Sequence, residues 1–322
     1  SVLVIPEVAI IRNQTGTRLT ITSDVAISDA QLAGVLSDIN RPRVVSQGLN
    51  NVTWLPGSRP VSEWQSAVDS AVARINAGEL DKVVLARDIV AQLDEPIHIG
   101  ALLIRLNESF PECWTFCVDG LVGATPELLI RRDGEHVTSR VLAGTMRRSR
   151  DTDRDGQLAA ELLDSDKDQE EHVYAVESVA AALATHCTDL NVPEHPFILR
   201  LANVQHLATD VTGELVDAAP ALALAASLHP TAAVCGTPTE RATHVIKELE
   251  GMDRGRYSAP VGWLAANGNG EFGIALRCAL VETDDRKTLR LFAGCGIVAG
   301  STGESEVAES QAKFAAMKSA LE

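Results

Sequence analysis

Three charged residues near the C-terminal end of the chain repeat at the spacing of one helical face. Glu306, Glu309 and Lys313 are separated by three and four residues in GESEVAESQAKF. A helix advances about 100° per residue, so these side chains share one face. One interpretation is a solvated face, on which a Glu309–Lys313 pair stabilises the helix by only about 0.2–0.5 kcal/mol. The other is a divalent cation held by both glutamates, with Lys313 directed at an anionic ligand.

A third glutamate could complete such a cation site. Glu171 lies near the start of a predicted helix, within the acidic run DSDKDQEEH. Acidic residues in a first helical turn complement the helix dipole, and that role alone would explain the residue. As a third oxygen ligand beside Glu306 and Glu309, it would complete a set that suits Mg²⁺, which takes few carboxylates together with substrate oxygens and waters.

Two ionisable residues border apolar strand sequences. Lys82 begins KVVLARDIV; it is either a strand-end lysine whose charged head reaches water or a general base, which requires a pKa well below the usual value of about 10.4. Glu127 follows Pro126 and precedes an apolar strand. It is either a solvated strand end or, if buried, a carboxyl group with a raised pKa that can donate a proton.

His206 and Arg277 each interrupt an apolar strand pattern. His206, in VQHLATD, alternates with apolar neighbours, as many core histidines do. Arg277 lies within IALRCAL, where a guanidinium must be paired and a ligand carboxylate would pair it with two hydrogen bonds. The turns LAGT (142–145) and AGCGIV (293–298) contain small residues. Their backbone N–H groups could bind carboxylate oxygens.

The composition is that of a globular protein and excludes several classes of partner. The 322 residues are 45% hydrophobic and 22% charged, which allows one large domain or two. The net charge of −16 argues against a surface for nucleic acid or an anionic membrane. No apolar run approaches the roughly 18 residues of a membrane span. The six cysteines form no CxxC pair, so we expect free thiols and a cytoplasmic protein.

Periodicity predicts the elements that would position these residues. Helices are expected over residues 62–78, 168–187, 237–250 and 301–322, the last beginning with a capping box of Ser301 and Glu304. A strand is expected over 81–93, extended structure over 197–215, and hairpins over 127–145 and 271–298. Strands occur in antiparallel pairs between helices, without strict βαβ alternation, which favours an α+β layered architecture.

Taken together, these segments resemble the chorismate-utilising enzymes, the group that contains anthranilate, aminodeoxychorismate, salicylate and isochorismate synthases. The matching motifs follow the family order and are KVVLAR, GATPELL, LAGT, KDQEEH, VQHL, HPTAAVCGTP, RGRYSAPVGW, IALRCAL, AGCGIV and EVAESQAKF. The resemblance implies a layered α/β sandwich of two mostly antiparallel sheets flanked by helices. It also implies one interwoven catalytic domain over residues 61–322. Residues 1–60 match no motif; we assign them to the same fold and expect the natural start of the chain upstream of Ser1.

Isochorismate synthases are the most similar members of that family. Thr239 stands where the amine-transferring members usually have lysine, and Ala233 where salicylate synthases tend to have threonine. The first alternative is a salicylate synthase, which also eliminates pyruvate from isochorismate. The second is a non-catalytic homologue that binds a ligand or a partner subunit; the presence of Lys82, Glu127 and the carboxylates argues against it.

The resemblance implies the following roles. Glu171, Glu306 and Glu309 would hold Mg²⁺ against the ring carboxylate of chorismate. Lys82 would activate water for attack at C2, and Glu127 would protonate the departing C4 hydroxyl. The expected substrate-binding residues are Gly144, Thr145, His206, Ala233, Tyr257, Arg277, Gly294 and Lys313. We expect a monomer or homodimer without a glutaminase subunit, whose product could feed menaquinone, siderophore or salicylate synthesis.

Overall fold

The structure is a computed structural model that describes residues 1–13, 16–41 and 51–322. The chain divides into two compact units, residues 1–47 and residues 48–322. The first unit contains an antiparallel hairpin and one helix, namely β1 (Val8–Asn13), β2 (Gly16–Ile21) and α1 (Asp29–Asn40). All residues with an expected role lie in the second unit.

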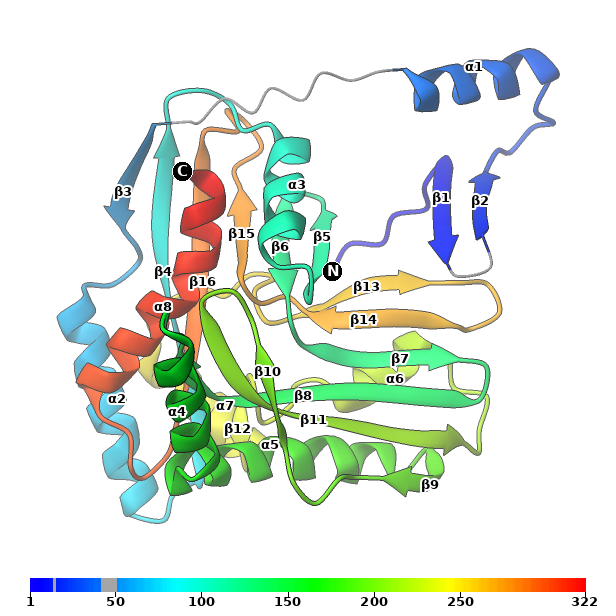
Figure 1. Cartoon of the computed structure of the whole chain (residues 1–322). Helices are drawn as coiled ribbons and strands as arrows, with labels where there is room; N and C mark the ends of the chain where they lie inside the picture. Colours follow the sequence, from blue (N-terminus) through cyan, green and yellow to red (C-terminus); the bar gives the residue numbers. More distant parts are fainter. Residues whose placement is uncertain (14–15, 42–50) are drawn as a thin grey trace. The chain divides into compact units, whose positions relative to one another are not determined.

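Two seven-stranded sheets form the second unit (Figure 1). Sheet A has the order β10-β11-β8-β7-β14-β13, with β9 also paired to β11. Its strands are β7 (Leu128–Asp133), β8 (His136–Arg147), β9 (Cys187–Asn191), β10 (Phe197–Arg200), β11 (Val204–Leu215), β13 (Pro260–Leu264) and β14 (Gly270–Ile274). Sheet B has the order β12-β4-β16-β15-β6-β5, with β3 paired to β4. Its strands are β3 (Val52–Pro56), β4 (Lys82–Leu93), β5 (Trp114–Val118), β6 (Leu121–Thr125), β12 (Gly236–Thr237), β15 (Cys278–Val281) and β16 (Thr288–Ile297).

Seven helices flank the two sheets in residues 51–322. They are α2 (Val61–Asn76), α3 (Ile99–Ser109), α4 (Thr152–Leu163), α5 (Asp166–Leu183), α6 (Ala221–Leu228), α7 (Thr239–Leu249) and α8 (Gly303–Leu321). Every strand pairing in both sheets is antiparallel. The expected α+β architecture of antiparallel sheets flanked by helices is therefore confirmed. None of the helices in the described part of the chain is long and apolar enough to cross a membrane.

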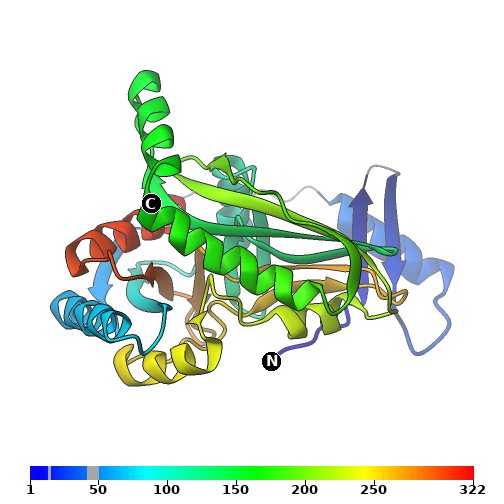
Figure 2. The same cartoon turned by 90° about the horizontal axis from the view of Figure 1, so that it is seen from below.

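Each sheet buries one apolar face against helices. Helices α5 and α6 lie along sheet A (Figure 2), where Val179 and Leu224 pack against Ile130 and Val211. Along β4 of sheet B, the odd-numbered residues face helices: Leu85 packs with α2 and α7, and Ala91 packs with α3 and α8. Because side chains alternate along a strand, the even-numbered side chains, from Lys82 onward, point to the opposite face of sheet B. That face borders the candidate site.

The hairpin predicted over residues 271–298 is correct only in its second half, which contains β15 and β16. Strand β14 joins sheet A, whereas β15 and β16 form a hairpin in sheet B. The chain passes from one sheet to the other between Ile274 and Cys278, where Arg277 has a φ of 47°. Arg277 therefore lies in a crossover and not in the middle of a strand. Alternation alone could not reveal this, because β14 and β15 each have an apolar pattern.

Helix α8 begins one residue later than predicted. Its N-cap is Thr302, whose side chain forms the capping box with Ser305, in place of Ser301 and Glu304. The helix passes an edge of sheet B at which β16 has a partner strand on one side only. Strand β16 pairs with β4 over residues 288–297 but with β15 only over residues 289–291. Side chains of α8 can therefore reach the end of β16 on the side that lacks a partner strand.

Candidate active site

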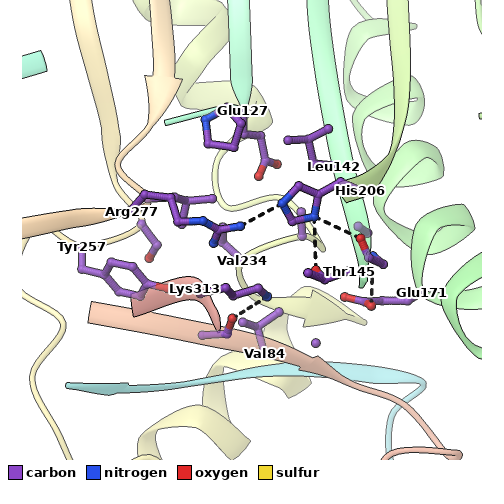
Figure 3. Close-up of a pocket in the computed structure, with 18 of the residues that line it drawn as sticks. Val84, Glu127, Leu142, Thr145, Glu171, His206, Val234, Tyr257, Arg277 and Lys313 are labelled. Carbon is purple, nitrogen blue, oxygen red and sulfur yellow. Dashed lines mark hydrogen bonds between the residues drawn. The ribbon is translucent and has the colours of Figure 1, made fainter. Parts of the chain in front are cut away.

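A cavity of about 570 Å³, including its open mouth, is lined by residues from both sheets and from α5 and α8. Ten of the predicted site residues line it, and Figure 3 shows most of them: Glu127, Gly144, Thr145, Glu171, His206, Ala233, Tyr257, Arg277, Gly294 and Lys313. The other three, Lys82, Glu306 and Glu309, lie immediately behind this wall. Each of the three is ion-paired to a residue of the site or of the adjoining helix.

Lys82 is fully buried at the start of β4. Its Nζ lies 3.3 Å from Glu171 Oε1 and donates a hydrogen bond of 3.2 Å to the Glu171 carbonyl oxygen. A lysine with no exposed surface is not a strand-end lysine that reaches into water, so the first of its two interpretations is wrong. Its amine instead lies behind the cavity wall, against Glu171, which lines the cavity.

Glu127 is buried between β6 and β7. Burial raises the pKa of its carboxyl group from 4.5 to about 8, although the positive charges of Lys82, Arg277 and Lys313 oppose this shift. The interpretation as a solvated strand end is therefore also wrong. At neutral pH the carboxyl group holds its proton and can donate it.

Glu171 is held in place by Gly144 and by β16. The segment LAGT (142–145), which was expected to be a turn, lies within β8, where Gly144 has a φ of 75°. Glu171 accepts a hydrogen bond of 3.2 Å from the backbone N–H of Gly144. Burial raises the pKa of Glu171, but the charges of Lys82, Lys313 and Lys167 more than offset it, so the pKa lies below its usual range. A Cβ atom at Gly296 would lie 2.0 Å from Glu171 Oε1, so glycine is needed there for the carboxylate to occupy this position.

His206 orients Arg277 toward the cavity (Figure 3). Arg277 Nη2 donates to His206 Nε2 at 2.9 Å. Since a guanidinium only donates, the imidazole proton must be on Nδ1, which donates to the Gly144 carbonyl oxygen at 3.1 Å and lies 3.2 Å from Thr145 Oγ1. Burial, together with the charges of Arg277 and Lys313, lowers the pKa of His206 well below its usual value. His206 is therefore a neutral positioning residue.

Lys313 and Tyr257 lie on either side of Gly294. Lys313 Nζ donates to the Gly294 carbonyl oxygen at 2.8 Å and pairs with Glu309 at 2.6 Å. Although burial lowers the pKa of Lys313, the charge of Glu309 raises it above its ordinary value, so the ammonium form persists. The Tyr257 ring stacks on Phe292 with a centroid distance of 5.2 Å. The predicted Glu309–Lys313 pair exists, but it is largely buried and not solvated.

Several residues that line the cavity were not predicted from the sequence. They are Val84, Pro126, Leu142, Ala143, Val234, Arg254, Ser258, Leu276 and Gly296. Most of them lie within one or two residues of a predicted site residue, so strand alternation could have indicated some of them. Arg254 is different: it pairs with Glu250 at 2.6 Å and donates to the Val84 carbonyl oxygen at 2.8 Å, so it supports the wall of the cavity.

The model of the family described as "Chorismate binding enzyme" matches residues 1–322. The chain belongs to this family.

Several relatives of the chain are named as isochorismate synthases. The isochorismate synthase DhbC of Bacillus subtilis is 42% identical over 278 residues, which are 82% of this chain and 69% of that protein. Isochorismate synthase MenF of the same organism is 40% identical over 263 residues, 80% of this chain and 55% of that protein. The solved structure of MenF, the menaquinone-specific isochorismate synthase from Escherichia coli, has a TM-score of 0.81, is 29% identical and covers 98% of this chain and 75% of that one. The chain thus spans only part of the length of these relatives.

The carboxylates of this chorismate-binding enzyme fit a divalent cation. Atoms of Glu306, Glu309 and Cys295 that could bind a metal lie within 4.8 Å of one another. Glu306 is fully buried, and its Oε2 atom has no hydrogen-bond partner in the described part of the chain. Burial and the charge of Glu309 raise the pKa of Glu306, and a bound cation would reverse that shift. Carboxylate oxygens are ligands that Mg²⁺ prefers.

Glu171 is not in this cluster of three residues. It lies on the cavity side, beside Lys82. Its role as a third ligand therefore remains a prediction.

Proposed function

We propose that the chain is an isochorismate synthase that converts chorismate to isochorismate with the help of Mg²⁺. The observation that carries the proposal is the pair of Lys82 and Glu127. The buried amine of Lys82 lies behind the cavity wall, against Glu171, and the protonated carboxyl group of Glu127 lines the cavity. A hydroxyl transposition needs a base for the incoming water and an acid for the departing hydroxyl. The relatives named as isochorismate synthases support the same reaction.

The positive groups of the cavity suit a dicarboxylate. Arg277 and Lys313 line the cavity, and we assign them to the substrate carboxylates. Arg277 can bind one carboxylate with two hydrogen bonds, in an orientation that His206 fixes. The backbone at Gly144 and Gly294, with Thr145, Ala233 and Tyr257, would complete the contacts. A Mg²⁺ ion held by Glu171, Glu306 and Glu309 would supply positive charge for the ring carboxylate.

The reaction requires one proton transfer at each of two atoms. We assign Lys82 as the base that takes a proton from the water that forms the new bond to C2. As the ring double bonds shift, the bond between C4 and its hydroxyl breaks, and Glu127 gives its proton to the departing oxygen. Water is consumed at C2 and released at C4, so no oxidant or reductant is needed. Both groups are buried, and burial raises the pKa of Glu127 so that it keeps the proton that it must donate.

We also propose that residues 61–322 form the catalytic domain, because every residue with an assigned role lies between Lys82 and Lys313. We further propose that the enzyme acts on chorismate without a glutaminase subunit, because the formation of isochorismate, the reaction in the names of its relatives, transfers no amine.

The test is to incubate the purified chain with chorismate, with and without Mg²⁺, and to separate the products by chromatography. We expect a Mg²⁺-dependent equilibrium mixture of chorismate and isochorismate, without pyruvate. Salicylate together with pyruvate would instead identify a salicylate synthase, the alternative that shares these residues. Unchanged chorismate at every Mg²⁺ concentration would contradict the proposed activity.

A further inference from the structure

A thiol lies among the carboxylates of the candidate Mg²⁺ site. Cys295 precedes Gly296 on β16, and its side chain points to the helix-covered face of sheet B, like that of its neighbour Leu85 on β4. It is fully buried, and its Sγ–H donates to the Glu306 carbonyl oxygen at 3.3 Å. Cys295 Sγ and one carboxylate oxygen each of Glu306 and Glu309 lie within 4.8 Å of one another. A magnesium site does not require this thiol, because Mg²⁺ prefers oxygen ligands.

The second observation that indicates a bound cation is a carboxylate oxygen of Glu306 that lacks a hydrogen-bond partner in the described residues. The Oε1 atom of Glu306 is engaged by Lys167 Nζ at 2.7 Å and by Ser305 Oγ at 3.3 Å. Its Oε2 atom is buried and has no partner in the described residues. Buried carboxylate oxygens are normally paired, and an unpaired one calls for an explanation. A cation beside Oε2 would provide the missing partner without displacing Lys167.

We propose that Cys295, Glu306 and Glu309 form a binding site for thiophilic divalent cations of the Zn²⁺ and Cd²⁺ type. Zn²⁺ accepts one sulfur and two carboxylate oxygens in a tetrahedral arrangement, which leaves the fourth position for water. When the ion binds, the S–H bond breaks, the metal–sulfur bond forms and the proton passes to the buffer. No atom changes its oxidation state.

Such an ion would compete with the Mg²⁺ of the proposed function, because both would use Glu306 and Glu309. Zn²⁺ should therefore inhibit the enzyme in competition with Mg²⁺. Only this inhibition rests on the proposed function. The binding itself depends on the three side chains and can be measured without substrate.

The experiment uses Cd²⁺ and Zn²⁺ as probes on the full chain. Cd²⁺ bound to a thiolate gives a charge-transfer absorption band in the ultraviolet, and we expect one such band that saturates at one ion per chain. Cys295→Ala should abolish the band and weaken Zn²⁺ binding roughly tenfold or more. Mg²⁺ binding, measured by competition with Mn²⁺, should change less than about twofold, because Mg²⁺ does not use the thiol.

The matched control is Cys278→Ala, which removes another fully buried thiol whose Sγ–H donates to the Ala275 carbonyl oxygen outside the cluster. That variant should keep the band. If Cys295→Ala does not fold, Cys295→Ser provides a smaller change for the same measurement. The proposal is overturned if the original chain gives no band, if the band survives loss of the Cys295 thiol, or if Zn²⁺ and Mg²⁺ binding weaken equally. Because no substrate is present, a chain inactive toward chorismate would leave this result interpretable.

Discussion

At the scale of single residues, Glu127 shows how a buried carboxyl group affects both catalysis and stability. Its pKa of about 8 in the folded chain lies above its ordinary value of 4.5. Between these values the folded state keeps the proton while the unfolded state releases it. The free energy of unfolding therefore falls as the pH rises through this window. The group that we assign as the acid thus destabilises the fold at neutral pH.

Glu127→Gln should remove turnover and this pH dependence together. Glutamine is neutral at every pH, so at pH 7 we expect the variant to be more stable by up to roughly 3 kcal/mol, since each unit of pKa corresponds to about 1.36 kcal/mol. Urea denaturation at pH 5 and pH 8 measures the effect. Glu95→Gln, a change at an exposed glutamate, is the control and should leave both curves unchanged. Equal pH dependence in Glu127→Gln and in the original chain would mean that Glu127 is ionised in the folded state.

Lys82 is ion-paired with Glu171, so substitution of Lys82 should affect the stability of the fold as well as the reaction. Removing one partner of a buried pair leaves an unpaired charge and costs about 3–5 kcal/mol; we expect this for Lys82→Met in urea denaturation without Mg²⁺. The double variant Lys82→Met with Glu171→Gln should recover most of that stability, while turnover stays absent. Recovery of turnover in the double variant would exclude Lys82 as the base, and no recovery of stability would show that the pair is not coupled.

At the scale of elements, the sequence predicted those that depend on local pattern. Helices α2, α5, α7 and α8 and strand β4 were predicted within a few residues, because their apolar periodicity and turn residues are local signals. The crossover at Arg277 was not predicted, since pairing partners are set by the tertiary structure. The burial of Lys82 and Glu127 could not be decided from the sequence either. The family resemblance, and not periodicity, indicated which residues gather at one cavity.

A prediction at this scale concerns Gly296 at the end of β16, which lies against Glu171. Gly296→Ala would place a Cβ atom 2.0 Å from Glu171 Oε1 and 3.0 Å from Lys82 Cε. Both side chains would have to move, so turnover should fall by roughly tenfold or more while the fold persists. Gly156→Ala is the matched control, because a Cβ atom there meets nothing within 4 Å in helix α4. Steady-state kinetics and circular dichroism of both variants test this; equal turnover in the two would reject the role of Gly296.

At the scale of the whole molecule, the distribution of charge links folding to the cation. The chain has a net charge of −16, and Glu306 and Glu309 lie close together on α8. In the free protein Lys167 and Lys313 each pair with one of them. These lysines limit the repulsion, but Glu306 Oε2 remains without a partner in the described residues. A cation that binds only the folded state should therefore stabilise the whole second unit.

The thermal unfolding midpoint should rise with Mg²⁺ concentration at constant ionic strength. A ligand that binds only the folded state stabilises it by about 2.7 kcal/mol at one hundred times its dissociation constant, a shift that NaCl of equal ionic strength should not reproduce. Glu309→Gln should flatten the dependence on Mg²⁺, because it removes a carboxylate from the cluster. Glu304→Gln changes an exposed glutamate of the same helix and should leave the dependence intact. Since both substitutions alter the net charge equally, a flattened response in both would mean that Mg²⁺ only screens the negative charge of the chain, whereas a response lost in Glu309→Gln alone would assign the cation to the carboxylate cluster.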